Sequence, residues 1–378
     1  MKRVSPPALS LPVNLTENLP NTSNPSVSRR DILAASAAAV TTTGNCFGKE
    51  PPRDPVAFFL VGDTHYFANK KKPGQLDDRS RRITTGLINT LNTLPGTTIS
   101  AAAGGGTVAM PRGVIHAGDL IDSGDKNGPL WEAMQKTEWQ AFESDFGIAE
   151  ATGRLRYPTF EVHGNHDGPQ AKGIAIDGII ARNQKRTGLT GRSASGLHCS
   201  WDWGLVHFVN LGIVVGQVPE VTQRRRYAPM NSLGFLVDDL KEHVGDSRRP
   251  VVITHHIDLA RYSRNCKADD PANLNREWHP CDVRGFHNAI RDYNVVAILH
   301  GHTHARNVLR WDGDSTRSDQ GISVFNVDNS AHFHGGKQAF FYFEISNETI
   351  LVRECGTQDG WESYQWTPRV WSRSSENS

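Results

Sequence analysis

The chain has 378 residues and a balanced charge, with 41 basic and 40 acidic side chains. This balance argues against a basic arm or patch, so we expect neither nucleic acid nor a charged membrane surface as a partner. The length allows one large domain or two ordinary ones. Histidine stands out, with 16 residues, and many of these histidines follow short apolar runs.

The first 48 residues are polar and differ from the rest of the chain. Arg29 and Arg30 form a pair just before the weakly apolar stretch 32–40, which is too short to span a bilayer because a span needs roughly 20 residues. This pattern is typical of a twin-arginine export signal, and a disordered N-terminus with a chance arginine pair is the alternative. We therefore expect an exported protein of the periplasm, cell envelope or medium. The mature chain should have no stable membrane span, and lipidation of Cys46 is not expected because Asn45 precedes it.

From residue 56 onwards, short runs rich in Val, Ile and Phe alternate with amphipathic stretches. The runs predict buried strands, and an apolar face of helical period predicts helices over 78–94, 130–146 and 232–243, the last with Ser232 as N-cap. A hairpin is expected to turn near Trp203 and Gly204. The runs after residue 321 follow one another without helices.

Alternation of strands and helices is typical of an α/β core. We predict a four-layer α-β-β-α sandwich, in which two mixed β-sheets are flanked by helices. The expected organisation is an export signal and linker over 1–48, one domain over 49–356, and a polar, Trp-containing tail over 357–378. The glycine-rich loop 100–113 lacks the lysine and hydroxyl residue of a phosphate-binding P-loop.

Polar side chains with metal-binding chemistry follow five of the predicted strands. These candidates are Asp63 and His65; Asp119; Asn165, His166 and Asp167; His255 and His256; and His302 and His304. In open α/β sheets, ligands bind at the carboxyl ends of the strands. Carboxylate, amide and imidazole donors suit Mn, Fe, Zn or Ni, and the absence of cysteine argues against a structural zinc site. Two divalent ions that share one carboxylate would use seven such donors.

The motifs D-x-H at 63–65, G-D-x-x-D at 118–122, G-N-H-D at 164–167, V-x-x-H at 252–255 and G-H-x-H at 301–304 occur in this order. Together they resemble the calcineurin-like metallophosphoesterase superfamily over residues 56 to about 310. The resemblance implies a dinuclear centre in which Asp63, His65 and His304 bind the first metal. Asn165, His255 and His302 would bind the second metal, and Asp119 would bridge the two.

The resemblance also implies hydrolysis of a phosphoester by a metal-bridging hydroxide, with His166 assisting the leaving group and Asp167 orienting its ring. Asn165, His166 and His256 would contact the substrate. Asp122 stands where purple acid phosphatases carry a tyrosine, so a colourless enzyme with divalent metals is expected. Asp122 is expected to accept a hydrogen bond from a ligand, and His116, His163 and His300 are expected to be structural.

The substrate stays open between a phosphomonoester and a phosphodiester, of a small molecule or a lipid. Cyclic nucleotides and phospholipid head groups are diester candidates. From another functional class, a non-catalytic envelope protein that binds metal or phosphate would carry the same donors. Cys266 and Cys281 bracket a loop and could form a disulfide, but free thiols at Cys199, Cys266, Cys281 and Cys355 are equally consistent with the sequence. The sequence does not indicate the oligomeric state.

Overall fold

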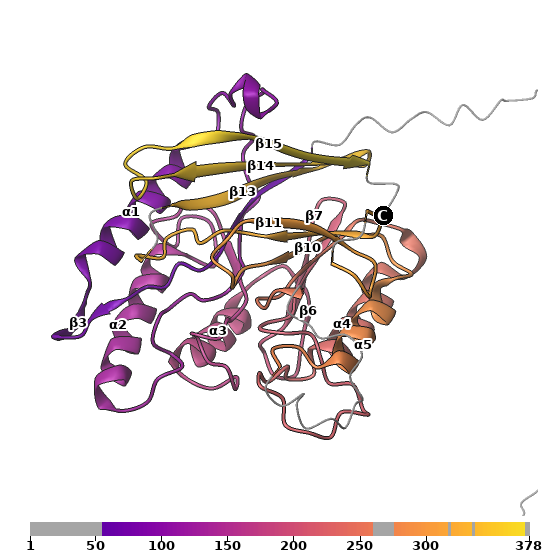
Figure 1. The fold of residues 1–378 in the computed structure, drawn as a ribbon, viewed down its shortest axis with the longest axis horizontal. Coiled ribbons are helices and arrows are strands. Elements are labelled where there is room, and N and C mark those ends of the chain that lie inside the picture. The colour runs from indigo at the N-terminus through magenta and orange to yellow at the C-terminus, as the bar shows by residue number, and fades with distance from the viewer. Residues whose placement is uncertain (1–54, 260–275, 317–318, 335–336, 375–378) are drawn as a thin grey trace, which may run out of the picture. The chain divides into compact units, whose positions relative to one another are not determined.

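The computed structural model of the protein describes residues 55–259, 276–316, 319–334 and 337–374 (Figure 1). The predicted export segment with Arg29 and Arg30, Cys46, and Cys266 lie outside these residues. No helix within the described ranges is long and apolar enough to cross a membrane.

The first sheet has six strands in the order β15-β14-β13-β1-β4-β5. Its strands are β1 (Val56–Val61), β4 (Val114–His116), β5 (Thr159–Glu161), β13 (Gln338–Ile345), β14 (Thr349–Thr357) and β15 (Gln365–Ser374). Strand β1 pairs in parallel with β4 and antiparallel with β13, and β4 pairs in parallel with β5. The sheet is therefore mixed, and its parallel part directs the carboxyl ends of β1, β4 and β5 to one edge.

The second sheet has seven strands in the order β11-β12-β10-β9-β8-β7-β6. They are β6 (Leu189–Arg192), β7 (Cys199–Trp203), β8 (Val206–Asn210), β9 (Val251–Thr254), β10 (Val295–His300), β11 (Asn307–Trp311) and β12 (Ile322–Asn326). Strands β8, β9, β10 and β12 are parallel. The predicted hairpin near Trp203 is confirmed as β7 and β8.

Helices cover the outer face of each sheet (Figure 1). The helices α1 (Asp78–Thr93), α2 (Pro129–Asp145) and α3 (Ile174–Lys185) share a core with β1, whereas α4 (Ser232–Asp239) and α5 (Pro280–Ile290) share one with β9 and β10. Helix α4 continues as a π-helical turn over Leu240–Val244. The smaller elements are β2 (Ala68–Asn69), β3 (Lys72–Leu76), and 3-10 turns at Ala101–Ala103 and Gly245–Ser247.

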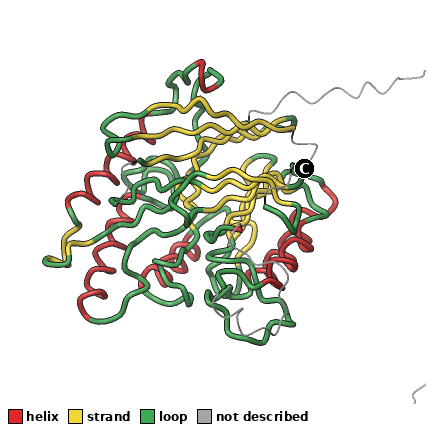
Figure 2. Tube along the Cα trace, in the orientation of Figure 1, coloured by secondary structure: helices red, strands yellow, loops and turns green. Residues whose placement is uncertain are grey.

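The four layers follow from the two-residue period of the strands. In β1, Phe59 and Val61 pack in the cluster that contains α1, whereas Phe58 and Leu60 lie in the cluster between the two sheets. All four side chains are fully buried. The tube in Figure 2 shows the strands gathered between the helices. The predicted α/β sandwich of two mixed sheets is confirmed.

Two local predictions differ from the structure. Residues 365–374 of the expected polar tail form β15, which pairs antiparallel with β14 at the edge of the first sheet. Trp366 packs against the core that contains α1, and Trp371 packs against the core between the two sheets. The N-cap of α4 is Asn231, and the Ser232 hydroxyl instead donates to the carbonyl of Val214.

The cysteines of the described chain form no disulfide. Cys199, Cys281 and Cys355 are buried free thiols. Burial raises the pKa of Cys199 to about 12, so this thiol stays protonated and unreactive at neutral pH.

Candidate metal centre

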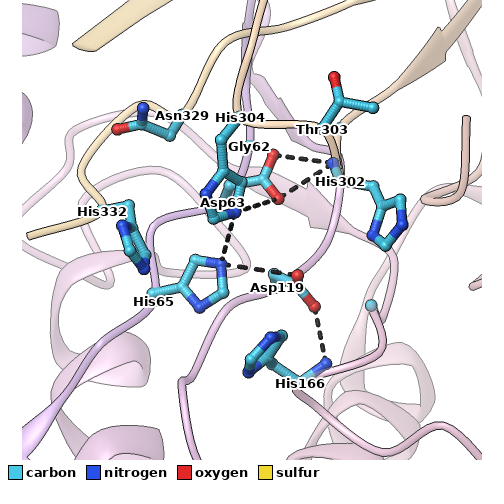
Figure 3. A network of polar contacts seen from close by, with 12 residues as sticks. Gly62, Asp63, His65, Asp119, His166, His302, Thr303, His304, Asn329 and His332 are labelled. Carbon is cyan, nitrogen blue, oxygen red and sulfur yellow. Dashed lines mark hydrogen bonds and ion pairs between the residues drawn. The ribbon is translucent and has the colours of Figure 1, made fainter. Parts of the chain in front are cut away.

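The loops after β1, β4, β5 and β10 meet at one edge of the sandwich (Figure 3), and His256 from the loop after β9 joins them beside Asp119. The backbone N–H of His302, from the second sheet, donates to both carboxylate oxygens of Asp63, from the first sheet, at 3.0 Å each. The backbone N–H of His166 donates to the Asp119 carboxylate at 2.8 Å. These bonds fix the two carboxylates and join the loops of both sheets.

The backbone at this edge is unusual. Asp63, His65, Asp119, His302 and His304 have φ values of 51°, 42°, 53°, 79° and 50°. Non-glycine residues seldom adopt the left-handed region, and Asp and His are among those that tolerate it best. Residues held there cluster at functional sites, where the surrounding structure over-determines the conformation. Five such residues on three loops therefore indicate a site whose geometry is set in advance.

Glycines allow the donors to lie close to neighbouring backbone. A side chain at Gly118 would collide with the ring of His256, and one at Gly164 would collide with the carboxylate of Asp119. Gly118 also has a φ of 95°, which favours glycine. Glycine at positions 118 and 164 therefore leaves space for the buried donor side chains of both sheets.

One group of donors joins Asp63, His65, Asp119 and His304. His65 Nε2 lies 3.1 Å from His304 Nε2 and 3.5 Å from Asp119 Oδ2, and His304 Nε2 lies 3.4 Å from Asp63 Oδ1. His65 Nδ1 faces the Asp122 carboxylate at 3.2 Å, so its proton belongs on Nδ1 and a lone pair on Nε2. A cation between these atoms, either a proton or a metal ion, would stabilise so close an arrangement of acceptors.

A second group joins Asp119, His256 and His302. His256 Nδ1 donates to the carbonyl of Ala117 at 2.7 Å, and its Nε2 lies 3.2 Å from Asp119 Oδ2 and 3.2 Å from Asn165 Oδ1. Asp119 is common to both groups. The arrangement therefore offers two adjacent candidate cation positions that share one carboxylate.

His255 was predicted as a ligand of the second metal, and the structure places His256 there instead. The chain leaves β9 after Thr254 and no longer alternates as a strand. The His255 ring turns into the core, where it stacks on His300 at 5.6 Å and packs against Trp278 at 5.1 Å. Neither of its ring nitrogens has a hydrogen-bond partner in the described chain. Burial, followed by His300, holds the pKa of His255 well below its usual range.

The structural roles expected for three other histidines agree with the geometry. His116 Nε2 lies 3.0 Å from the Thr64 hydroxyl, and burial lowers the pKa values of His116 and His163 to about 3. His300 is buried with Nε2 3.7 Å from Asp258. All three lie inside the fold as neutral rings.

One of the two acids next to the donor groups, Asp167, has a role that differs from the prediction. Asp122 accepts from His65, as expected. Asp167 was predicted to orient His166, but its carboxylate accepts the backbone N–H groups of Leu120, Ile121 and Gly164 instead. His166 Nδ1 donates to the backbone carbonyl of Asp122 at 2.9 Å. Asp167 therefore braces the loops, and the main chain orients the ring.

Two residues near the donors were missed by the sequence reasoning. His332 lies in the loop after β12, with its ring 4.4 Å from that of His65. Glu277 Oε1 lies 3.2 Å from His302 Nε2. Neither residue belongs to one of the five motifs that follow apolar runs, so the pattern of strand ends does not identify His332 or Glu277. The only hint in the sequence is that "HFH" at 332–334 places another two histidines close together.

The electrostatics show how strongly the site favours positive charge. Burial acts to raise the pKa of Asp119, but His256, His65 and His166 outweigh it and hold this pKa well below its usual range. Burial acts to lower the pKa of His256, yet the Asp119 carboxylate prevails and raises it to about 9. Two ionised carboxylates, Asp63 and Asp119, are thus fully buried. Such burial is costly unless cations compensate it, so the donor set fits two divalent metals.

The family of calcineurin-like phosphoesterases matches residues 56–306, which contain every residue of the two donor groups that share Asp119. The chain belongs to the calcineurin-like phosphoesterase family, whose members hydrolyse phosphoesters with metal ions. A comparison with curated proteins gives no match.

One solved structure with a TM-score above 0.5 supports the fold, and two others are less similar. A dimetal phosphatase from Danio rerio is similar with a TM-score of 0.52 and 11% identity, over 85% of this chain and 99% of that one. The anchor of the inner membrane complex of Plasmodium matches with a TM-score of 0.43 and 12% identity, over 83% of this chain and 89% of that one. A predicted phosphoesterase from Streptococcus pneumoniae gives 0.34 and 11%, over 85% and 99%.

Proposed function

We propose that the protein hydrolyses a phosphomonoester or phosphodiester with two divalent metal ions. The observation that supports this proposal is the pair of donor groups that share Asp119, because together they offer ligand atoms for two adjacent metal ions. Asp63, His65, Asp119 and His304 would hold one ion, and Asp119, Asn165, His256 and His302 the other. When bound, such ions neutralise phosphate charge and activate water at neutral pH.

His166 is the residue best placed to assist the leaving group. Its ring packs edge-on against that of His65 at 4.7 Å, and its Nδ1–H bonds to the Asp122 carbonyl. Nε2 is thereby left to hold or release the proton that moves. Burial acts to lower the pKa of His166, but Asp119 and the Asp122 carbonyl raise it above its usual value. This direction favours the protonated ring, as a general acid requires.

The proposal is tested by a screen of the protein with aryl phosphate monoesters and diesters, after loading with Mn, Zn, Fe or Ni. We expect turnover that depends on metal, and a preference between p-nitrophenyl phosphate and bis-(p-nitrophenyl) phosphate that assigns the substrate class. His166→Ala should lower kcat about 10²- to 10⁴-fold while metal content stays unchanged.

The control variant is His116→Gln, whose ring lies in the interior and faces Thr64; kcat should fall less than about threefold per folded molecule. Bound metal without turnover on any ester would favour the non-catalytic binding protein. Turnover that survives His166→Ala unchanged would remove this residue from the proposal.

We further propose that the chain is exported by its twin-arginine segment. The support is the pair Arg29 and Arg30 before a short apolar stretch. In a host with a twin-arginine pathway, replacement of both arginines by lysine should retain the protein in the cytoplasm. An unchanged distribution would contradict the proposal.

A further inference from the structure

A third histidine stands next to the first cation position, outside the stretch that the family match covers. His332 lies 4.4 Å from His65 and 4.6 Å from His304 between ring centres. Ligand atoms of the three rings lie within 4.8 Å of one another. Figure 3 shows His332 beside His65, on the side away from Asp119.

The loop that carries His332 is held in place at both sides of the ring. The backbone N–H of Ser330 donates to the Gly62 carbonyl at 2.8 Å, and the Gly62 N–H donates to the Ser330 hydroxyl at 3.1 Å. Gly62 directly precedes Asp63, so this loop and the first donor move together. On the other side, buried Phe333 stacks on Phe67 at 4.7 Å. His332 is therefore a fixed part of the site rather than a surface side chain.

Hydrogen bonding distinguishes His332 from the ligand histidines. His65 and His256 each donate from Nδ1 to an oxygen, which leaves a lone pair on Nε2. In His332 the pattern is reversed, because Nδ1 accepts the backbone N–H of His334 at 3.3 Å. The proton of the neutral ring then belongs on Nε2. A protonated nitrogen cannot bind a metal, but it can donate to an anionic oxygen.

The position of the ring agrees with such a donor. The group that contains both carboxylates, Asp63 and Asp119, does not include His332. The ring thus stands at the outer side of the first cation position. Its side chain is half-buried, so a substrate oxygen can reach it.

We propose that His332 is a substrate-binding residue whose Nε2–H donates a hydrogen bond to a phosphoryl oxygen beside the first metal. This inference rests on the proposed function, and it adds a residue from outside the family motifs. The bond forms to a charged oxygen, so its loss should affect substrate affinity and the transition state without affecting the metals.

The test compares His332→Ala, His332→Gln and the control His334→Ala. Glutamine keeps an N–H donor near the position of Nε2. His334→Ala keeps the backbone amide that donates to His332 and removes only a ring whose centre lies 5.3 Å from that of His332. Metal content and metal affinity are measured for each protein. Calorimetry then gives the Kd for inorganic phosphate, and steady-state kinetics give kcat/KM. We expect His332→Ala to keep the metals and to weaken phosphate binding and kcat/KM about ten- to a hundredfold. His332→Gln and His334→Ala should stay within about threefold of wild type.

Loss of a metal from His332→Ala would overturn the inference, because the ring would then be a ligand. Unchanged phosphate affinity and kcat/KM in His332→Ala would also overturn it. A wild-type protein that binds metals but turns over no ester would defeat the proposed function, and phosphate affinity would still decide about His332. A wild-type protein that takes up no metal would defeat both.

Discussion

The two sheets contribute different chemistry to the site. The loops of the first sheet supply both carboxylates, Asp63 and Asp119, and both are fully buried. The loops of the second sheet supply three imidazoles to the two donor groups, His256, His302 and His304, of which the last two are partly exposed. The first sheet thus provides the negative charge that attracts cations, whereas the second provides imidazoles, and the carboxylates raise the pKa values of His256 and His304.

This division predicts that substitutions in the loops of the first sheet and in the loops of the second sheet have different effects on the metal ions. Removal of a carboxylate changes the charge of the site and affects both ions when the carboxylate is Asp119. Removal of an imidazole takes away one ligand of one ion. The imidazole side is also the more open side, so variants there should alter substrate binding as well.

The largest effect is expected for Asp119→Asn. The amide keeps an oxygen that accepts the His166 N–H, so the loop is preserved, but the shared negative charge is lost. We expect weaker binding of both ions and a fall in kcat/KM of at least about 10³-fold. Metal analysis and kinetics over a metal titration check this, and retention of both metals at wild-type affinity would contradict the shared role.

The neighbouring histidines offer a sharper test of the imidazole side. His256→Ala should lose the second metal and about 10²-fold in kcat/KM, because its Nε2 faces Asp119 and Asn165. His255→Ala should keep both metals and turnover within about threefold.

The cost of His255→Ala should instead be about 2 kcal/mol of stability from the cavity in the core. Thermal unfolding and metal content of both variants measure the contrast. The reverse outcome, with metal lost from His255→Ala, would restore the assignment made from the sequence.

A smaller effect, on stability and not on metal binding, is expected for Glu161 at the end of β5 in the first sheet. Burial acts to raise the pKa of Glu161, but Arg182 and Arg186 prevail and lower it to about 2, from a usual 4.5. A lowered pKa stabilises the fold above the unfolded value and loses that contribution as pH falls from about 5 towards 2. Glu161→Gln should cost about 3 kcal/mol at pH 7, and its difference from wild type should shrink in acid. Urea unfolding at pH 7 and pH 3.5 measures both, and a difference independent of pH would exclude the ion pair as its source.

The sequence predicted the strand ends well because each buried run and its donor are local signals. Asp63, Asp119 and His302 each lie where the period of an apolar run predicts. The choice between His255 and His256 could not be made in this way, since it depends on how the chain turns after β9. The role of Asp167 depends on backbone groups of the distant loop at Leu120 and Ile121, and the place of His332 depends on how its loop packs on Gly62. Neither arrangement leaves a pattern in the sequence. Strand β15 was missed because polar residues occupy most of an edge strand.

The left-handed backbone of five donors limits how the site can be redesigned. Replacement of His302 or Asp63 by a β-branched residue would add strain of about 1–3 kcal/mol to the loss of the donor. Glutamate, a common choice for hard metals, lacks the short side chain that makes asparagine and aspartate tolerant of this conformation. Attempts to change the metal preference are thus confined to Asn, Asp and His at these positions, and a search among these three residues covers the accessible alternatives.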